Sequence, residues 1–143
     1  MDLSGRRVEQ AYLAIRADHK NIRQAILWSL VHDKETVVRD ALNTLYLFYL
    51  KQGWHEGIVA FKELAQLARE RFGPDDVRYQ LAIMYKTGFQ IFLGEHRQAA
   101  ALPPIIASLR HRKWLVELAY ALLVRGVAFI DDDKHGHGQA ELT

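Results

Sequence analysis

Residues 17–70 decide the fold, and they read ADHKNIRQAILWSLVHDKETVVRDALNTLYLFYLKQGWHEGIVAFKELAQLARE. Apolar residues recur at helical spacing through three consecutive segments of this stretch. The middle segment is hydrophobic from Leu42 to Leu50 and ends at Lys51-Gln52-Gly53, and a new helix starts at Trp54. Two helices joined by a very short turn, with small residues at the joint, form the unit of helical repeat proteins. The stretch therefore predicts an all-α fold.

Composition limits the classes of protein that the chain can belong to. Of its 143 residues, 50% are hydrophobic and 25% are charged, which is typical of one folded domain with a core. The formal net charge of +2 is too small to indicate binding to nucleic acid or to a membrane surface. The absence of cysteine excludes disulfides and thiolate metal sites. No apolar run reaches membrane-spanning length, and the first residues lack the apolar core of a signal peptide, so we expect a cytoplasmic protein.

The chain is expected to be a single domain of about seven helices in antiparallel pairs. Ser4 can cap the first segment, and residues 4–31 form either one helix or two, with a break near Asp18 favoured. The remaining helices are expected at residues 35–52, 54–71, 77–93, 95–110 with a break or kink at Pro103-Pro104, and 113–130. This divides the domain into N-terminal helices (1–34), a helix pair (35–73), a second pair (74–112) and an incomplete third pair (113–143).

The end of the sequence predicts an interruption. Residues 131–138, DDDKHGHG, are expected to form a polar loop, and Gln139–Leu142 looks like the first turn of another helix. We therefore expect the chain to be a fragment of a larger protein.

An internal repeat of roughly 40 residues supports the paired helices. Three segments that begin at Leu45, Gly88 and Gly126 share one pattern. Each has an aromatic-rich helix end, then a short turn, then a small residue in the next helix. These small residues are Gly57, Ala99 or Ala100, and Ala140. Two helices can approach closely only where a small side chain lies at their crossing, so these positions predict helix contacts.

This pattern resembles the tetratricopeptide repeat, in a degraded form. The resemblance implies a right-handed helical solenoid in which the first helices of successive pairs line a concave surface. Counted by the resemblance, the candidate binding residues of this surface are Asn43, Leu47, Lys51, Tyr85, Phe89, Tyr120 and Leu123. Asn43 is expected to need a polar partner because it lies among leucines. Core packing is the competing interpretation for each of the hydrophobic positions.

Asp18 to Leu30, DHKNIRQAILWSL, together with Lys51-Gln52-Gly53 and Glu56-Gly57, resembles a more specific family. It is similar to the tetratricopeptide-like domain of multidomain bacterial regulators of the signal-transduction ATPase class, such as large LuxR-type and antibiotic-regulatory transcription factors. The resemblance implies a sensor or effector-binding arm beside ATPase or DNA-binding domains. This chain has no G-x-x-x-x-G-K-[ST] loop of its own, so it lacks that phosphate-binding motif.

Three clusters could carry chemistry, and each has a simpler interpretation. His55-Glu56 would need a second histidine at position 59 for a zinc-protease motif, and that residue is Val59. The acidic run 131–133 with His135 and His137 contains metal-ligand types on a glycine-containing segment, for which a solvated loop is favoured. The basic run 110–113 could contact phosphate, but cations at a helix C-terminus also complement the helix dipole.

These observations favour a non-enzymatic domain with no cofactor and no metal. We expect it to bind a peptide, a protein or a small effector on the concave helical surface. The alternatives are a structural oligomerisation arm, with self-association as a homodimer through one end of the helical stack, and an α-helical metal-dependent enzyme. No membrane partner and no direct binding of nucleic acid are expected.

Overall fold

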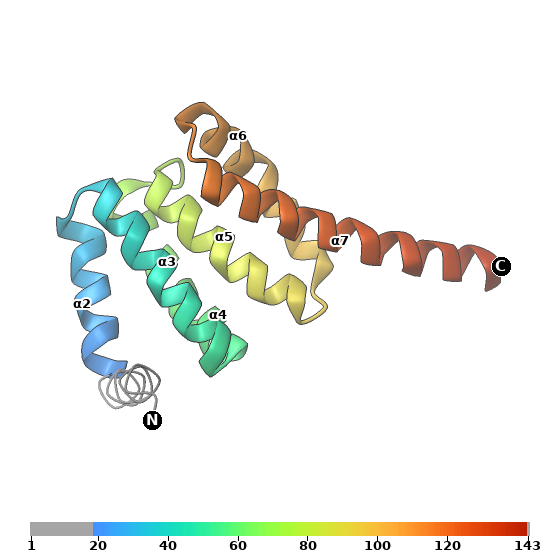
Figure 1. Cartoon of the computed structure of the whole chain (residues 1–143), viewed down its shortest axis with the longest axis horizontal. Coiled ribbons are helices and arrows are strands. Elements are labelled where there is room, and N and C mark those ends of the chain that lie inside the picture. The colour runs from blue at the N-terminus through green and yellow to red at the C-terminus, as the bar shows by residue number, and fades with distance from the viewer. Residues whose placement is uncertain (1–18, 143) are drawn as a thin grey trace, which may run out of the picture.

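The computed structural model describes residues 19–142, with side chains described for residues 21–130. Within this range the chain forms six α helices and one 3-10 helix, and no strand (Figure 1). The helices are α2 (His19–His32), α3 (Glu35–Gln52), α4 (Trp54–Phe72), α5 (Val77–Phe92), η1 (His96–Ala101), α6 (Leu102–Arg112) and α7 (Leu115–Leu142). The all-α prediction is confirmed. The expected start of the first helix at Ser4 and the expected break near Asp18 lie outside the described residues.

The helices contact one another in an alternating order. α5 packs against α3 on one side and against α7 on the other, so these three helices lie next to one another (Figure 1). α4 packs most extensively against α5 and also contacts α2 and α3. α6 and η1 lie against α5 and α7. α5 is therefore the central helix, and it carries the largest share of fully buried side chains.

Aromatic rings from four helices fill the centre of the core. The ring of Tyr46 on α3 stacks on Tyr85 of α5 at 4.9 Å between centroids, and it meets the edge of Tyr120 on α7 at 5.0 Å. Phe61 on α4 packs against Tyr85 at 5.3 Å and against Phe89 at 6.3 Å. Aromatic pairs in these tilted and offset geometries add stabilisation beyond the area that they bury.

Two glycines provide the space that these rings occupy. A Cβ on Gly57 of α4 would lie 2.7 Å from the ring of Phe89, and a Cβ on Gly88 of α5 would lie 1.9 Å from the hydroxyl of Tyr120. Both distances are far shorter than carbon can tolerate without a shift of the ring. The prediction that Gly57 is a small residue at a helix contact is confirmed.

The turns explain why the helices end where they do. Gly73 ends α4 with a φ of 94°, which favours glycine, and the backbone N–H of Gly73 still donates to the carbonyl of Arg69. Asp76 caps α5, because its side chain accepts a hydrogen bond of 2.9 Å from the backbone N–H of Arg78. Gly53 takes no left-handed conformation, because its φ of 162° is that of extended backbone. It ends α3 and begins α4 at the same residue.

Two predicted helix boundaries were wrong. The segment His96–Ala101 is a 3-10 helix, and Pro103 and Pro104 lie in the first turn of α6. Backbone N–H groups in a first turn have no acceptor within the helix, so proline loses nothing there. The polar loop expected at residues 131–138 is instead part of α7, which continues to Leu142. Glycine inside a helix costs about 1 kcal/mol relative to alanine but does not by itself end the helix.

Candidate functional site

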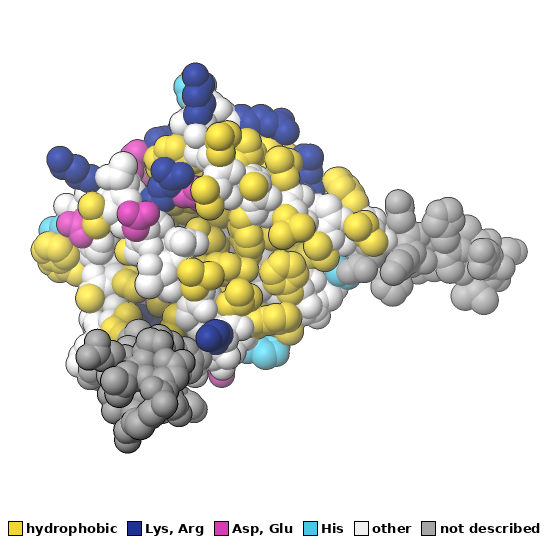
Figure 2. Space-filling model, in the orientation of Figure 1, with side chains coloured by type: hydrophobic (Ala, Val, Ile, Leu, Met, Phe, Trp, Pro, Cys, Tyr) yellow, Lys and Arg dark blue, Asp and Glu magenta, His cyan; other side chains and the backbone are white. Residues whose placement is uncertain are grey.

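Three neighbouring helices, α3, α5 and α7, form the surface on which the sequence places its candidate binding residues. Figure 2 shows hydrophobic side chains gathered over the part of this surface that belongs to α5 and the first half of α7. We call this surface the α3–α7 face. Of the seven candidate residues, Asn43, Leu47 and Lys51 are on α3, Tyr85 and Phe89 on α5, and Tyr120 and Leu123 on α7. All seven therefore belong to the helices of this face.

An ion pair joins the two outer helices of the face near their N-termini. Arg39 on α3 donates hydrogen bonds from Nε and Nη2 to the carboxylate of Glu117 on α7, and the second bond measures 2.7 Å. Glu117 is almost fully buried, with 5% of its side chain exposed. The hydrogen bond that Arg39 donates to Glu117 raises the pKa of Arg39, so the guanidinium stays charged. The guanidinium also lies 4.5 Å from the ring centre of Trp114.

A second ion pair lies beside the first one. Arg112, in the last turn of α6, donates a 3.0 Å hydrogen bond to Glu35, in the first turn of α3. This pair is about one-third exposed, so solvent weakens its attraction. The basic run 110–113 thus ends α6, as its simpler interpretation predicted, and one of its cations ties that end to α3.

Asn43 lies at a polar cavity of about 260 Å³ between α3 and α7. Its other lining residues are Arg39, Asp40, Val116 and Glu117. The structure shows no protein partner of the kind that was expected for the Asn43 amide. Asn43 is exposed, so water can satisfy the amide. Among the described residues, its side chain makes no hydrogen bond. An exposed amide offers two donors and one acceptor, which is the set that an extended peptide backbone requires.

The candidate residues on α5 belong to the core. Tyr85 is 3% exposed and Phe89 is fully buried, and both contact Tyr46. Tyr120 is half-buried, and its hydroxyl has no hydrogen-bond partner among the described residues. Burial raises the pKa of Tyr85 and of Tyr120, because a phenolate would lose its solvation there. These rings form the base of the α3–α7 face and shape it from below.

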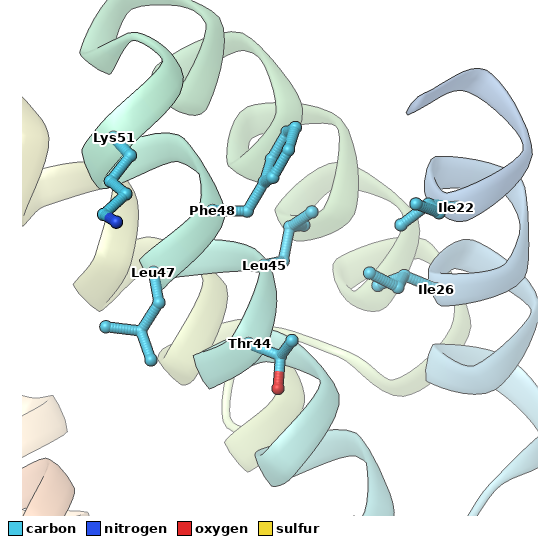
Figure 3. Close-up of a pocket in the computed structure, with 7 residues that line it drawn as sticks. All are labelled: Ile22, Ile26, Thr44, Leu45, Leu47, Phe48 and Lys51. Carbon is cyan, nitrogen blue, oxygen red and sulfur yellow. The ribbon is translucent and has the colours of Figure 1, made fainter. Parts of the chain in front are cut away.

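Leu47 and Lys51 lie beside a separate, apolar groove of about 390 Å³ between α2 and α3. Figure 3 shows Ile22 and Ile26 of α2 facing Leu45 and Phe48 of α3, with Leu47 and Lys51 on the side of α3 away from α2. Leu47 is 53% exposed and Lys51 is also exposed. Leu47 therefore presents an uncovered apolar side chain one helical turn beyond Asn43.

Sequence patterns missed the residues that organise the site. Arg39 and Glu117 are 78 residues apart, and each looks like an ordinary surface charge in its own helix. One signal was present, because Glu117 lies at helical spacing with the buried residues Ala121, Val124 and Ala128. A charged residue in line with a buried stripe needs a charged partner.

The part of the chain that the structure describes contains neither a cluster of metal ligands nor a membrane-spanning helix. No group of three or more histidine, aspartate or glutamate side chains there is arranged to hold a metal ion. His135, His137 and the acidic run 131–133 lie outside the described side chains. In the same range, no helix combines the length and the apolar character that crossing a membrane requires.

Comparison with known proteins found no relative: no family model, no curated protein and no solved structure matches this chain. The resemblances to the tetratricopeptide repeat and to bacterial regulators therefore stay predictions from the sequence.

Proposed function

We propose that the chain is a non-enzymatic interaction domain that binds a peptide or a peptide-like segment of another protein on the α3–α7 face. The observation that carries this proposal is the pairing of Asn43 with Leu47 on α3. One side chain offers an exposed amide, and the next turn offers an exposed apolar surface. An extended peptide presents the same two features in alternation, namely backbone N–H and C=O groups and side chains.

The charges of the cavity next to Asn43 suit such a ligand. Arg39 is engaged by Glu117, so the buried charge there is already balanced. Asp40 is exposed at the same cavity and can accept a hydrogen bond or pair with a basic side chain. A polar rim next to apolar side chains is the usual arrangement of a peptide-binding surface.

The order of helix contacts supports the finer architecture, a tetratricopeptide-like right-handed solenoid. Helices α3, α5 and α7 would be the first helices of successive pairs, and α4 and α6 the second helices. In this arrangement the binding surface is the concave one, and a ligand would act through small shifts between neighbouring helices. Such a domain suits a cytoplasmic bacterial regulator in which it passes a binding event to adjoining ATPase or DNA-binding domains.

Selection from a random peptide library, followed by fluorescence anisotropy with a labelled selected peptide, tests the proposal. Leu47→Glu and Asn43→Ala are expected to weaken the binding of the selected peptides about tenfold or more, because each removes one of the two matching features. Val59→Glu is the matched control, because Val59 is 60% exposed on α4, outside the face. Peptides that bind the Leu47→Glu and Asn43→Ala variants as tightly as the natural chain would refute the proposal.

A further inference from the structure

The described part of α7 has an uncovered side that is entirely apolar. Five large side chains there expose 59–73% of their surface, and the sixth exposed residue is Ala119. The large ones are Leu115, Val116, Leu123, Phe129 and Ile130. Exposed residues on α4 are, in contrast, mostly charged or polar, such as Glu56, Lys62 and Arg69. A contiguous apolar surface of this kind marks a contact site.

Part of this surface follows a regular repeat. Val116, Leu123 and Ile130 are each seven residues apart, and Ala119 and Gly126 lie three residues after the first two. Spacings of three and four residues place side chains on one line along a helix, as in the seam of a coiled coil. We call these five residues the α7 seam. Large and small residues alternate along it, which is the condition for two such seams to interdigitate.

Among the described residues of one copy, no side chain uses the space that Gly126 leaves open. A Cβ placed on it would meet no atom within 4 Å, and its φ is not positive. Gly57 and Gly88 each make room for a ring, but nothing occupies the space at Gly126. Glycine inside a helix costs about 1 kcal/mol relative to alanine. Close approach of a second helix outside this copy explains why a residue without a side chain lies there.

We propose that the α7 seam binds the α7 seam of a second copy of this chain, with the two helices antiparallel. In the register that fits best, Leu123 lies opposite Ala119 of the second copy, and Val116 lies opposite Gly126. A two-fold axis repeats both contacts, so every large seam residue between 116 and 126 meets a small one. All five seam residues are uncharged, so the pairing of two seams brings no like charges together.

The size of the surface suits a homodimer. Three large seam residues and the flanking Leu115 and Phe129 each expose about 60% of roughly 150 Å², which gives about 450 Å² per copy, or just over half of the ~800 Å² that each partner of a standard interface buries. Figure 1 shows the second half of α7 extending beyond the other helices, which leaves it accessible. The seam shares Val116 and Leu123 with the α3–α7 face, so a dimer would cover the α7 side of that face. Asn43 and Leu47 on α3, the test residues for peptide binding, lie outside the seam, so the two proposals can fail separately.

Sedimentation velocity on the whole chain at concentrations up to about 500 µM tests the dimer. The natural chain is expected to sediment as a dimer, and both Leu123→Glu and Gly126→Leu are expected to make it monomeric. Gly126→Leu is not expected to unfold a single copy, because a Cβ at this position meets no atom within 4 Å and leucine favours a helix more than glycine does. Circular dichroism should confirm unchanged or raised thermal stability. Val59→Glu, the control on α4, should leave the dimer intact.

Disulfide formation between single-cysteine variants tests the register, since the chain has no cysteine of its own. A mixture of Val116→Cys and Gly126→Cys should form a linked dimer. Val116→Cys alone should not, because two copies of position 116 would lie about 15 Å apart along antiparallel helices. A natural chain that stays monomeric, a dimer that survives both seam variants, or efficient linkage of Val116→Cys to itself would each overturn the proposal.

Discussion

Arg39 on α3 and Glu117 on α7 join two helices across the central helix α5, through two hydrogen bonds between a guanidinium and a nearly buried carboxylate. Removing Arg39 leaves the carboxylate buried without its cation. Arg39→Met should therefore lower the free energy of unfolding by about 2–3 kcal/mol, measured by urea denaturation. Arg112→Met breaks the more exposed pair with Glu35 and should cost about 1 kcal/mol or less. Equal costs for the two variants would contradict this assignment.

Gly88 and Tyr120 are expected to be energetically coupled. Gly88→Ala places a Cβ against the Tyr120 hydroxyl and should destabilise the chain by about 1–3 kcal/mol. Tyr120→Phe alone should cost little, because the hydroxyl that it removes is buried without a hydrogen-bond partner among the described residues. In the Tyr120→Phe background, Gly88→Ala should cost less than in the natural chain. A double-mutant cycle measures this difference, and strict additivity would show that the close contact is absent.

Asp76 should make stability depend on pH on the acid side. Burial opposes its charged form, but the hydrogen bonds from Arg78 outweigh burial and hold the pKa of Asp76 below its usual value of 3.8. A lowered pKa in the folded state adds stability above the unfolded pKa, and this stability is lost as the pH falls through the folded pKa. Asp76→Asn keeps a capping side chain but loses the charge.

The natural chain should therefore be more stable than Asp76→Asn at pH 7, and the difference should decrease only once the pH falls below 3.8, toward the lower pKa of the folded state. Urea denaturation between pH 7 and pH 3 provides the measurement. A difference that stays constant across this range would mean that the charge of Asp76 contributes nothing.

Lys113 is the only described residue other than glycine with a positive φ, and its φ is 59°. It ends α6 in the left-handed conformation, which costs a residue with a Cβ about 1 kcal/mol. Lys113→Gly should therefore stabilise the chain by a few tenths to about 1 kcal/mol, since the flexible unfolded state offsets part of the gain. Lys113→Ala removes the same charge without relieving the backbone and should bring no gain. Thermal denaturation of both variants distinguishes the two effects.

Local signals in the sequence were enough to place the helices between residues 35 and 93. The predicted helix at 35–52 matches α3, and α4 and α5 differ from their predictions by one residue at one end. These ends are set by nearby residues, namely Gly53, Gly73 and the cap at Asp76. Where a boundary depends on residues a few positions along the chain, local signals are sufficient.

The segment before α6 shows where local reading failed. Pro103 and Pro104 lack the N–H groups that an α helix would direct to the carbonyls of Ala99 and Ala100. The three alanines favour an α helix by propensity, yet without those bonds the segment takes the tighter 3-10 form. The sequence predicted a break or a kink at these prolines, but it did not predict that the preceding segment would change its helix type.

The site was predictable only in part, because it depends on contacts between distant helices. Exposure of Asn43 and burial of Phe89 follow from how α3 and α5 face α7, and no local pattern contains that information. The apolar residues of α7 show helical periodicity in the sequence. The sequence does not distinguish the side of α7 that packs against α5 and α6 from the side that stays exposed.

The ring of Tyr46 contacts rings on both α5 and α7. In an ordinary array of helical repeats each unit touches only its neighbours, so the array can lose structure gradually from its ends. Here one side chain contacts rings on two other helices at once, so α7 cannot separate from α3 and α5 without disturbing it. The domain should therefore lose its tertiary packing in a single cooperative transition, visible as the simultaneous loss of near-ultraviolet and far-ultraviolet circular dichroism.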